Sequence, residues 1–245
     1  MTHLELIRVE GLPEVRPGDD LGELIGSRSK FEPGDVVVVA QKVVSKSEGR
    51  IVSLQTVSAS DEAVRIASDL IAGPDPRMVQ VILDESVRVL RSHRVLITET
   101  RHGFVCANGG VDHSNVPAED EVTLLPVDPD ASADRLRSRL RELTGVDVGV
   151  IVSDTFGRPW RLGIVNVALG IAGLPALLDL RGSLDDAGKP LHATVLAIAD
   201  DIAAAAGIVM GKTARTPAVI VRGLRLEGGG RGRDLVRPAA EDLFR

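Results

Sequence analysis

The sequence contains a single cysteine, Cys106, so neither an intramolecular disulfide nor a cysteine-based zinc or iron–sulfur site can form. Any metal must therefore be held by oxygen or imidazole ligands. Aromatic residues are also scarce, with four Phe, one Trp and no Tyr, and the formal net charge is −6. The chain thus lacks both the stacking side chains and the positive charge that are typical of nucleic-acid binding. We expect no nucleic-acid partner, and a small molecule is favoured.

Long hydrophobic runs are missing as well. The longest segment without a charged residue, Leu162–Leu178, is interrupted by Asn166, Pro175 and glycines, and it falls short of the roughly 18 apolar residues that cross a bilayer. Near the N-terminus, Glu5 and Arg8 stand where a signal peptide needs an unbroken apolar stretch. We therefore expect a cytoplasmic protein with no membrane partner.

The residues that are present predict one α+β domain over residues 1–245, built on a mixed sheet. The chain is 44% hydrophobic and 26% charged, as is typical of a globular protein. β-Branched runs and helical stripes interleave without the strict alternation of a doubly wound parallel sheet. The expected strands are Leu4–Val9, Asp35–Ala40, Arg94–Thr98, Val122–Val127, Asp147–Val152 and Pro217–Val221, and the expected helices are Ser60–Ala72, Asp130–Leu143 and Asp200–Met210.

Two loop segments bear on the organisation of the chain. Composition changes at Pro126–Pro129, just before the expected Asp130 helix, which predicts a subdomain seam near residues 126–130. The segment Glu227–Arg233 contains four glycines and predicts a mobile surface loop.

The segment Val148–Asp154 predicts a buried strand that ends in Ser153 and Asp154, with Thr155 directly after it. An acid and a hydroxyl at the carboxyl end of a strand suit a divalent cation, because Mg²⁺ prefers hard oxygen ligands and phosphate completes its shell. A strand-terminating Asx-turn is the alternative. Downstream, Arg158 and Arg161 offer guanidinium groups for phosphate or carboxylate, although surface arginines are also common.

Two further polar groups could join this site. The segment Asn108–Pro117 reads NGGVDHSNVP, and its Asp112 could share a metal ion with Asp154, whereas His113 is a softer ligand than Mg²⁺ prefers. Lys42 and Lys46 lie four residues apart, so a helix would bring both to one face. They could contact phosphates or simply form a solvated face.

Three common nucleotide or hydrolase motifs are absent or incomplete. Gly207–Thr213 reads GIVMGKT, which is one residue short of a Walker loop and follows an expected helix rather than a strand. The chain has neither the glycine fingerprint of dinucleotide binding nor the nucleophile elbow of an α/β-hydrolase. The sequence therefore does not indicate a dinucleotide-dependent oxidoreductase or an α/β-hydrolase.

Several blocks, in collinear order, together resemble the coenzyme F420:L-glutamate ligase family, named after a deazaflavin coenzyme. They cover nearly the whole chain: GLPEVRPGDDL at 11–21, GDVVVVAQKVVSKSEGR at 34–50, ETRHGFVCANGGVDHSNVP at 99–117, VSDTFGRPWRLG at 152–163, DLRG at 179–182 and VMGKTARTPAVIVRG at 209–223. The resemblance implies a GTP-dependent enzyme that adds L-glutamate to F420-0, with Mg²⁺ or Mn²⁺ and, for some members, K⁺. It also implies a two-part α+β fold that forms an intertwined homodimer.

The resemblance implies roles for individual residues. Asp112 and Asp154 match metal-binding acids and Thr155 a second-metal ligand, while Lys46 and one or both of Arg158 and Arg161 would assist phosphoryl transfer electrostatically. The implied nucleotide contacts are Leu12, Pro13, Glu14, Val15, Gln41, Lys46, Asn115, and Met210, Gly211, Lys212 and Thr213 within the stretch that ends at Pro217.

Some positions depart from the family pattern. Val195 stands where many members have an acid, Leu180 replaces an aromatic residue, and Lys212 replaces an uncharged polar ligand. These changes put the second metal and the acceptor site in question. The chain ends at Arg245, so we expect no fused C-terminal flavin-binding domain.

Two other functions stay open at this point. One is a ligase of the same fold that acts on another carboxylate or amino acid. The other is a non-catalytic GTP-binding regulatory module, against which the presence of both Asp112 and Asp154 argues.

Overall fold

The structure is a computed structural model that describes residues 3–71, 73–113, 120–211 and 214–242. Its centre is a five-stranded mixed sheet in which only β2 and β8 run parallel. The mixed α+β class expected from the sequence is confirmed. In spatial order, the strands are β1 (Glu5–Arg8), β12 (Ala218–Arg222), β2 (Val36–Ala40), β8 (Gly149–Arg158) and β9 (Arg161–Ala172).

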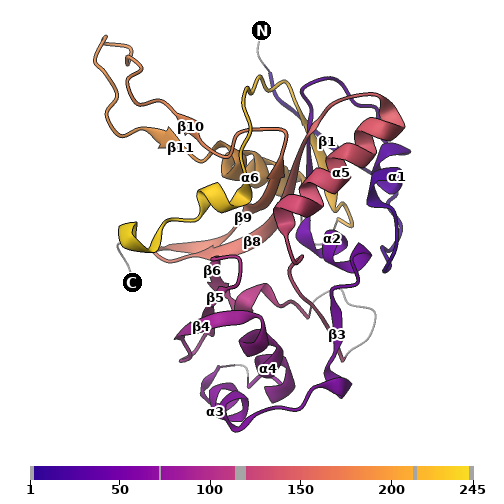
Figure 1. The fold of residues 1–245 in the computed structure, drawn as a ribbon, viewed down its shortest axis with the longest axis vertical. Coiled ribbons are helices and arrows are strands. Elements are labelled where there is room, and N and C mark those ends of the chain that lie inside the picture. The colour runs from indigo at the N-terminus through magenta and orange to yellow at the C-terminus, as the bar shows by residue number, and fades with distance from the viewer. Residues whose placement is uncertain (1–2, 72, 114–119, 212–213, 243–245) are drawn as a thin grey trace.

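Helices cover both faces of this sheet (Figure 1). The valines of β2 alternate between the two faces, so Val37 and Val39 pack toward one side and Val36 and Val38 toward the other. The first side is covered by α1 (Leu21–Gly26), α2 (Gln41–Ser47) and α5 (Pro129–Thr144), and the second by α6 (Ile198–Met210). This double burial explains the uninterrupted VVVV run.

Capping residues set where the helices begin. Ser60 accepts a hydrogen bond from the backbone N–H of Ala63 at the start of α3 (Asp61–Asp69), and Asp128 accepts one from Ala131 at the start of α5. Proline occupies the first turn of both α4 (Pro76–Asp84) and α5, where no backbone donor is needed. Gly145 ends α5 with a φ of 73°, a left-handed conformation that suits glycine.

The chain between β3 and β7 gathers around a separate hydrophobic cluster that includes Ile66, Ile82 and Leu96. Figure 1 shows this region below the central sheet, with β6 next to β8. Pro126–Pro129 lies where the chain leaves it for α5, and the two-part division stays a prediction. Its elements are β3 (Ile51–Ser53), η1 (Leu54–Thr56), α3 (Asp61–Asp69), α4 (Pro76–Asp84), β4 (Ser86–Arg91), β5 (Ile97–Thr100), β6 (Val105–Ala107), η2 (Asn108–Gly110) and β7 (Glu121–Thr123).

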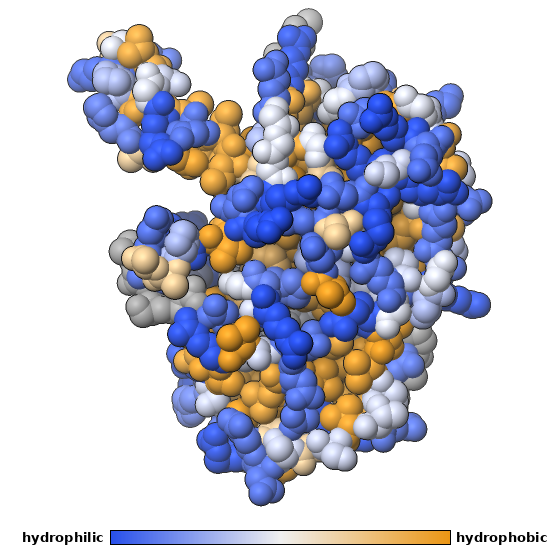
Figure 2. Space-filling model, in the orientation of Figure 1, coloured by the Kyte–Doolittle hydropathy of each residue, from blue (hydrophilic) through white to orange (hydrophobic). Residues whose placement is uncertain are grey.

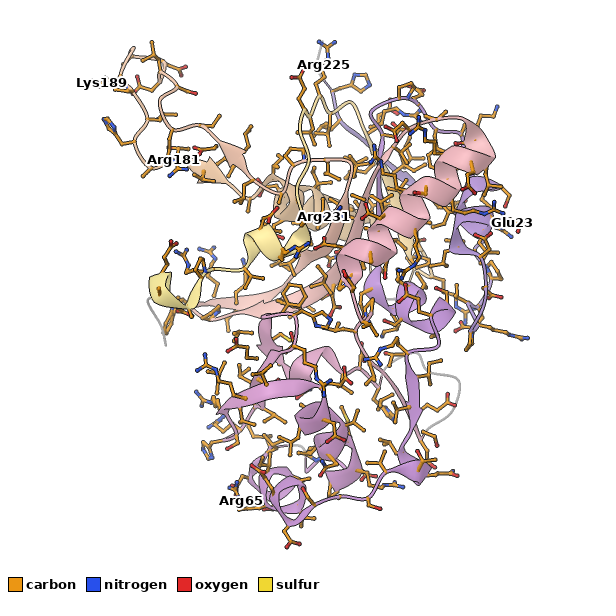
Figure 3. All side chains as sticks on the ribbon, viewed as in Figure 1. Glu23, Arg65, Arg181, Lys189, Arg225 and Arg231 are labelled. Carbon is orange, nitrogen blue, oxygen red and sulfur yellow. The ribbon has the colours of Figure 1, made fainter. Side chains whose placement is uncertain are left out.

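An arm made of β10 (Leu178–Asp179) and β11 (Val195–Leu196) projects from the body (Figures 1 and 2). It carries Arg181 and Lys189, which Figure 3 labels far from the sheet. The C-terminal segment adds η3 (Gly232–Leu235) and η4 (Ala239–Glu241). Among the described residues, we find no helix with the length and apolar character needed to span a membrane.

Several sequence-based boundaries were wrong. The expected Arg94–Thr98 strand begins only at Ile97, because Arg94 has a left-handed φ of 68°. The expected Val122–Val127 strand is replaced by the shorter Glu121–Thr123, and α3 ends at Asp69, which leaves Ile71 exposed rather than on the buried stripe. In α5, Leu143 is likewise exposed.

The glycine-rich segment Glu227–Arg233 is exposed at residues 227–229, as expected of a surface loop, but its end packs against the sheet. The mobility of this segment stays a prediction. Gly232 donates its backbone N–H to Asp130 Oδ1 at 2.7 Å, and η3 begins there and packs against β9. A Cβ on Gly232 would overlap the carbonyl oxygen of Leu169. Glycine is required there for close backbone packing.

Candidate active site

A cavity of about 1050 Å³ lies where the parallel pairing of β2 with β8 ends, at Ala40 and Ser153. Six described segments distant in the sequence line it: the loop before α1, the end of β2 with α2, Asp112, the β8–β9 pair, the end of α6, and residues 215–217. Among the described residues, its charged lining consists of three cationic and three anionic side chains: Lys42, Lys46, Arg215, Glu14, Asp112 and Asp154. Such a lining suits a ligand that carries phosphate together with a cation.

Both lysines come from α2, which begins directly after β2 ends at Ala40. Lys46 is buried, with 5% of its side chain exposed, and it donates a hydrogen bond to the Glu14 carboxylate. Lys42 Nζ lies 2.7 Å from Asp112 Oδ2. The structure thus confirms that the four-residue spacing brings both ammonium groups to one helical face, and it places that face on the cavity.

Asp154 and Thr155 lie inside β8 rather than at its end. The sequence predicts a strand that stops at Asp154, but β8 continues to Arg158 because β9 pairs with it along its whole length. The neighbouring strand β2 does end here, since Ala40 is the partner of Ser153. Asp154 and Thr155 therefore still line a cavity at the carboxyl end of the parallel pair.

Asp112 reaches the same cavity from the β3–β7 region. Two backbone hydrogen bonds with Thr123 fix its position. The N–H of Asp112 donates to the carbonyl oxygen of Thr123 at 3.0 Å, and the N–H of Thr123 donates to the carbonyl oxygen of Asp112 at 2.8 Å. The preceding Gly110 has a φ of 72°, and a Cβ there would collide with Leu125. The tight NGG turn thus places the carboxylate next to Lys42.

The donor set suits a hard divalent cation. Asp112 and Asp154 supply carboxylate oxygens and Thr155 a hydroxyl, all lining one cavity. No group of three or more His, Cys, Asp or Glu side chains suited to a metal occurs within the described part of the chain. A cation here would complete its shell with hydroxyls, water or substrate phosphate, which is how Mg²⁺ is commonly bound.

The side chain of Gln41 is engaged inside the protein. It is 2% exposed, and its amide nitrogen donates to Ser45 Oγ at 2.6 Å and to the carbonyl oxygen of Leu124 at 3.0 Å. The second of these bonds joins α2 to the segment after β7. Because its side-chain nitrogen is engaged, Gln41 would contact a nucleotide through its side-chain oxygen or its backbone.

Cys106 lies close enough to Asp154 for the two groups to interact electrostatically. Burial raises the pKa of its thiol to about 12, and the negative charge of Asp154 contributes to the rise. The thiol is therefore protonated at neutral pH and is not an activated nucleophile.

Most of the residues implied by the resemblance come together in this cavity. Those in its lining are Leu12, Pro13, Glu14, Val15, Gln41, Lys46, Asp112, Asp154, Thr155, Met210 and Gly211. Arg158 and Arg161 are not in the lining, because they flank the exposed tip of the β8–β9 hairpin. Asn115, Lys212 and Thr213 lie outside the described residues.

Some lining residues have no sequence signal of their own. Asn166 accepts a hydrogen bond from Thr155 Oγ1 at 3.3 Å, and Gly207 lies against its side chain. Ile208 of α6 lines the cavity as well. These residues reach the cavity through the pairing of β9 with β8 and the packing of α6, which the sequence does not show.

Comparison with known proteins identifies the family of the chain that forms this cavity. The model of the F420-0:gamma-glutamyl ligase family matches residues 11–223, a span that contains every lining residue from Leu12 to Pro217. The chain belongs to this family. Proteins named coenzyme F420:L-glutamate ligase are similar to it over essentially their full lengths. The one from Methanopyrus kandleri is 48% identical, with 100% of both chains covered. Those from Methanothermobacter thermautotrophicus (99% of both chains covered) and Archaeoglobus fulgidus (99% of this chain and 96% of that protein) are each 46% identical. The named activity of these relatives is that of a ligase forming an amide bond.

Proposed function

We propose that the protein is a GTP-dependent ligase that adds L-glutamate to coenzyme F420-0, and then extends the γ-linked glutamate tail, in the biosynthesis of coenzyme F420. The observation that carries the proposal is the cavity in which Lys42, Lys46, Asp112, Asp154 and Thr155 meet. Family membership and full-length similarity to coenzyme F420:L-glutamate ligases support the choice of substrates.

Amide formation in water requires an activated carboxylate. In the proposed reaction, the lactyl carboxylate oxygen of F420-0 attacks the γ-phosphorus of GTP, and the bond to the bridging oxygen of GDP breaks. The amine of L-glutamate then attacks the resulting acyl phosphate, so that an amide forms and phosphate leaves with the former carboxylate oxygen. The amine loses a proton, and later rounds use the γ-carboxylate of the glutamate just added.

The two lysines would bind the phosphates. Each of them has a carboxylate partner in the structure, Glu14 for Lys46 and Asp112 for Lys42. Phosphate oxygens can replace these carboxylates, and charge-assisted hydrogen bonds to ammonium groups stabilise the charge of the transferring phosphoryl group. The loop 12–15 and the end of α6 would hold the rest of the nucleotide, as the resemblance implies.

Asp112, Asp154 and Thr155 would hold Mg²⁺ or Mn²⁺, and the resemblance implies K⁺ as a further cation. A divalent ion, when bound, neutralises charge on the phosphates. The oxygen donors fit that role. One oxygen of Asp112 already pairs with Lys42, so this carboxylate must exchange or share its partner when a metal binds.

A homodimer would explain the exposed apolar hairpin. At the tip of β8–β9, Trp160 is 78% and Leu162 96% exposed, and on α6 Ile208 is 81% exposed. Figure 2 shows further hydrophobic residues at the base of the arm, where Leu178 and Leu196 are exposed. We propose that a second copy covers these surfaces, and that Arg158 and Arg161 assist the reaction from that interface. Sedimentation of wild type and Leu162→Glu tests this, because a monomeric wild type would overturn it.

The test of the reaction is to incubate the protein with GTP, Mn²⁺, L-glutamate and F420-0 and to follow product mass and GDP release. Asp154→Asn is the matched control, since it removes one charge at almost unchanged size. We expect a glutamyl mass increment with wild type only. Transfer of ¹⁸O from the labelled F420-0 carboxylate to phosphate would support the acyl phosphate.

Other outcomes separate the alternatives. GTP consumption with a different carboxylate or amino acid, but not with F420-0 and L-glutamate, would overturn the assigned substrates. Tight binding of GTP and metal without turnover of any acceptor would indicate a regulatory module instead.

A further inference from the structure

Ser153 is a buried residue whose hydroxyl has no hydrogen-bond partner in the described structure. It is 2% exposed and lies in the middle of β8. Among the described residues, only His102 Nδ1 shares this property of a buried side-chain polar atom without a partner. Burying a hydroxyl without a hydrogen bond is unfavourable, so such a group calls for an explanation.

Other buried serines of the chain do have partners. Ser132, 4% exposed, donates to Glu48 Oε1 at 2.6 Å, and Ser45 accepts a hydrogen bond from Gln41. The unpaired hydroxyl is therefore not a general feature of serines in this fold. It occurs at a serine that lines the candidate active site.

The place of Ser153 in the sheet connects it to that site. Side chains alternate along a strand, so Ser153 shares a face of β8 with Thr155, whose hydroxyl bonds to the lining residue Asn166. Its partners on the neighbouring strands are Ala40 and Ala168, which are both small and apolar. They offer no side-chain acceptor, so a partner for the hydroxyl has to come from elsewhere.

We propose that Ser153 Oγ donates a hydrogen bond to a phosphate oxygen of the nucleotide bound in this cavity. Lys42, Lys46 and Arg215 in the same lining can pair with phosphate oxygens, while its three carboxylates suit the accompanying cation. Ser153 is then a substrate-contacting residue whose hydrogen-bonding capacity is satisfied only in the complex. This inference rests on the proposed function, because it takes the nucleotide as the ligand.

The experiment compares wild type, Ser153→Ala and Ser132→Ala, first by thermal unfolding without ligand and then by titration with GTP and Mn²⁺ in the absence of acceptor. For Ser153→Ala, we expect an unchanged or higher melting temperature without ligand, because no hydrogen bond is lost. We expect its dissociation constant for GTP to rise about tenfold to a hundredfold, since a hydrogen bond to a charged group is lost.

The control Ser132→Ala should behave in the opposite way. It loses two hydrogen bonds outside the cavity, the one that Ser132 Oγ donates to Glu48 Oε1 and the one that it accepts from Arg135 Nη2, so its melting temperature should fall while its GTP affinity stays that of wild type. Ser153→Thr retains the hydroxyl and should recover GTP affinity relative to Ser153→Ala.

The possible failures are distinguishable. If wild type binds GTP and Ser153→Ala binds it equally well, the Ser153 contact is wrong and the proposed function stands. If Ser153→Ala unfolds at a clearly lower temperature without ligand, its hydroxyl has a structural role and the inference is also overturned. If wild type itself does not bind GTP, both the proposed nucleotide and the proposed Ser153 contact are wrong.

Discussion

Lys42 Nζ lies 2.7 Å from Asp112 Oδ2, so a lysine of the sheet region is paired with a carboxylate of the β3–β7 region across the candidate active site. The side chain of Lys42 is 19% exposed and that of Asp112 is 41% exposed. This pair places a positive charge beside a carboxylate that would bind the proposed cation. A metal ion and Lys42 would therefore compete for the negative charge of this carboxylate.

Removal of this competitor should strengthen metal binding. We expect Lys42→Met to lower the dissociation constant for Mn²⁺, in the absence of nucleotide, by about two- to fivefold, the worth of a partly exposed ion pair. Titration calorimetry measures this directly. Lys42→Arg, which keeps the charge, serves as the control. Weaker Mn²⁺ binding by Lys42→Met would show that Lys42 supports the metal site rather than competing with it.

Lys46 should contribute more to nucleotide binding than any exposed lysine. Its ammonium group is buried beside Glu14, so its charge is poorly screened by solvent. We expect Lys46→Met to weaken GTP binding by about tenfold to a hundredfold, the loss of a charge-assisted hydrogen bond.

The matched control is Lys30→Met, which removes a lysine outside the cavity lining. It should bind GTP like wild type. Equal affinities for wild type and Lys46→Met would remove Lys46 from the proposed phosphate site.

Arg222 should be important for stability rather than for activity. Asp35 is 1% exposed, and Arg222 donates to its two oxygens at 2.9 Å and 2.7 Å, which raises the pKa of Arg222 above its usual range. Replacement of Arg222 by Met leaves a buried carboxylate without its charged partner. We expect the free energy of unfolding to fall by about 3–5 kcal/mol, measured by urea denaturation.

An exposed pair provides the comparison. Arg181 forms an ion pair with Asp179 on the arm, where both side chains are largely solvent-exposed (Figure 3). Arg181→Met should not measurably change the free energy of unfolding, because solvent screens such pairs. Equal losses in the two variants would mean that burial of Asp35 does not govern the effect.

The sequence is informative about the site where function depends on local spacing. Lys42 and Lys46 share a helical face because a helix repeats every 3.6 residues, and β2 is recognisable because four consecutive valines are typical of a strand buried on both sides. Asp112 and Asp154 lie in separate segments, so the resemblance to known blocks, rather than spacing, indicates that they belong together.

Features that depend on tertiary contacts are not visible in the sequence. β8 extends past Asp154 because β9 supplies hydrogen bonds to a polar, glycine-containing stretch. Gly232 resembles a loop glycine but packs directly on the backbone of β9. The same holds for Asn166, whose place in the cavity follows from its pairing with Thr155.

Asp200 should make the stability of the protein depend on pH. It lies in the first turn of α6, its Oδ1 accepts a hydrogen bond from the backbone N–H of Ala168 at 2.8 Å, and burial raises its pKa above the ordinary value of 3.8. Below that value, the carboxyl is protonated in both the folded and the unfolded chain. As the pH rises, the unfolded chain loses this proton first, so Asp200 increasingly disfavours folding until the folded protein also ionises.

Asp200→Asn removes this titration and keeps an oxygen that can accept the hydrogen bond from Ala168. We expect the stability of Asp200→Asn relative to wild type to be greater at pH 7 than at pH 4, as measured by urea denaturation at both values. Comparison with wild type cancels the contributions of the other acids. If Asp200→Asn and wild type differ in free energy of unfolding by the same amount at pH 4 and pH 7, burial does not perturb the Asp200 carboxyl.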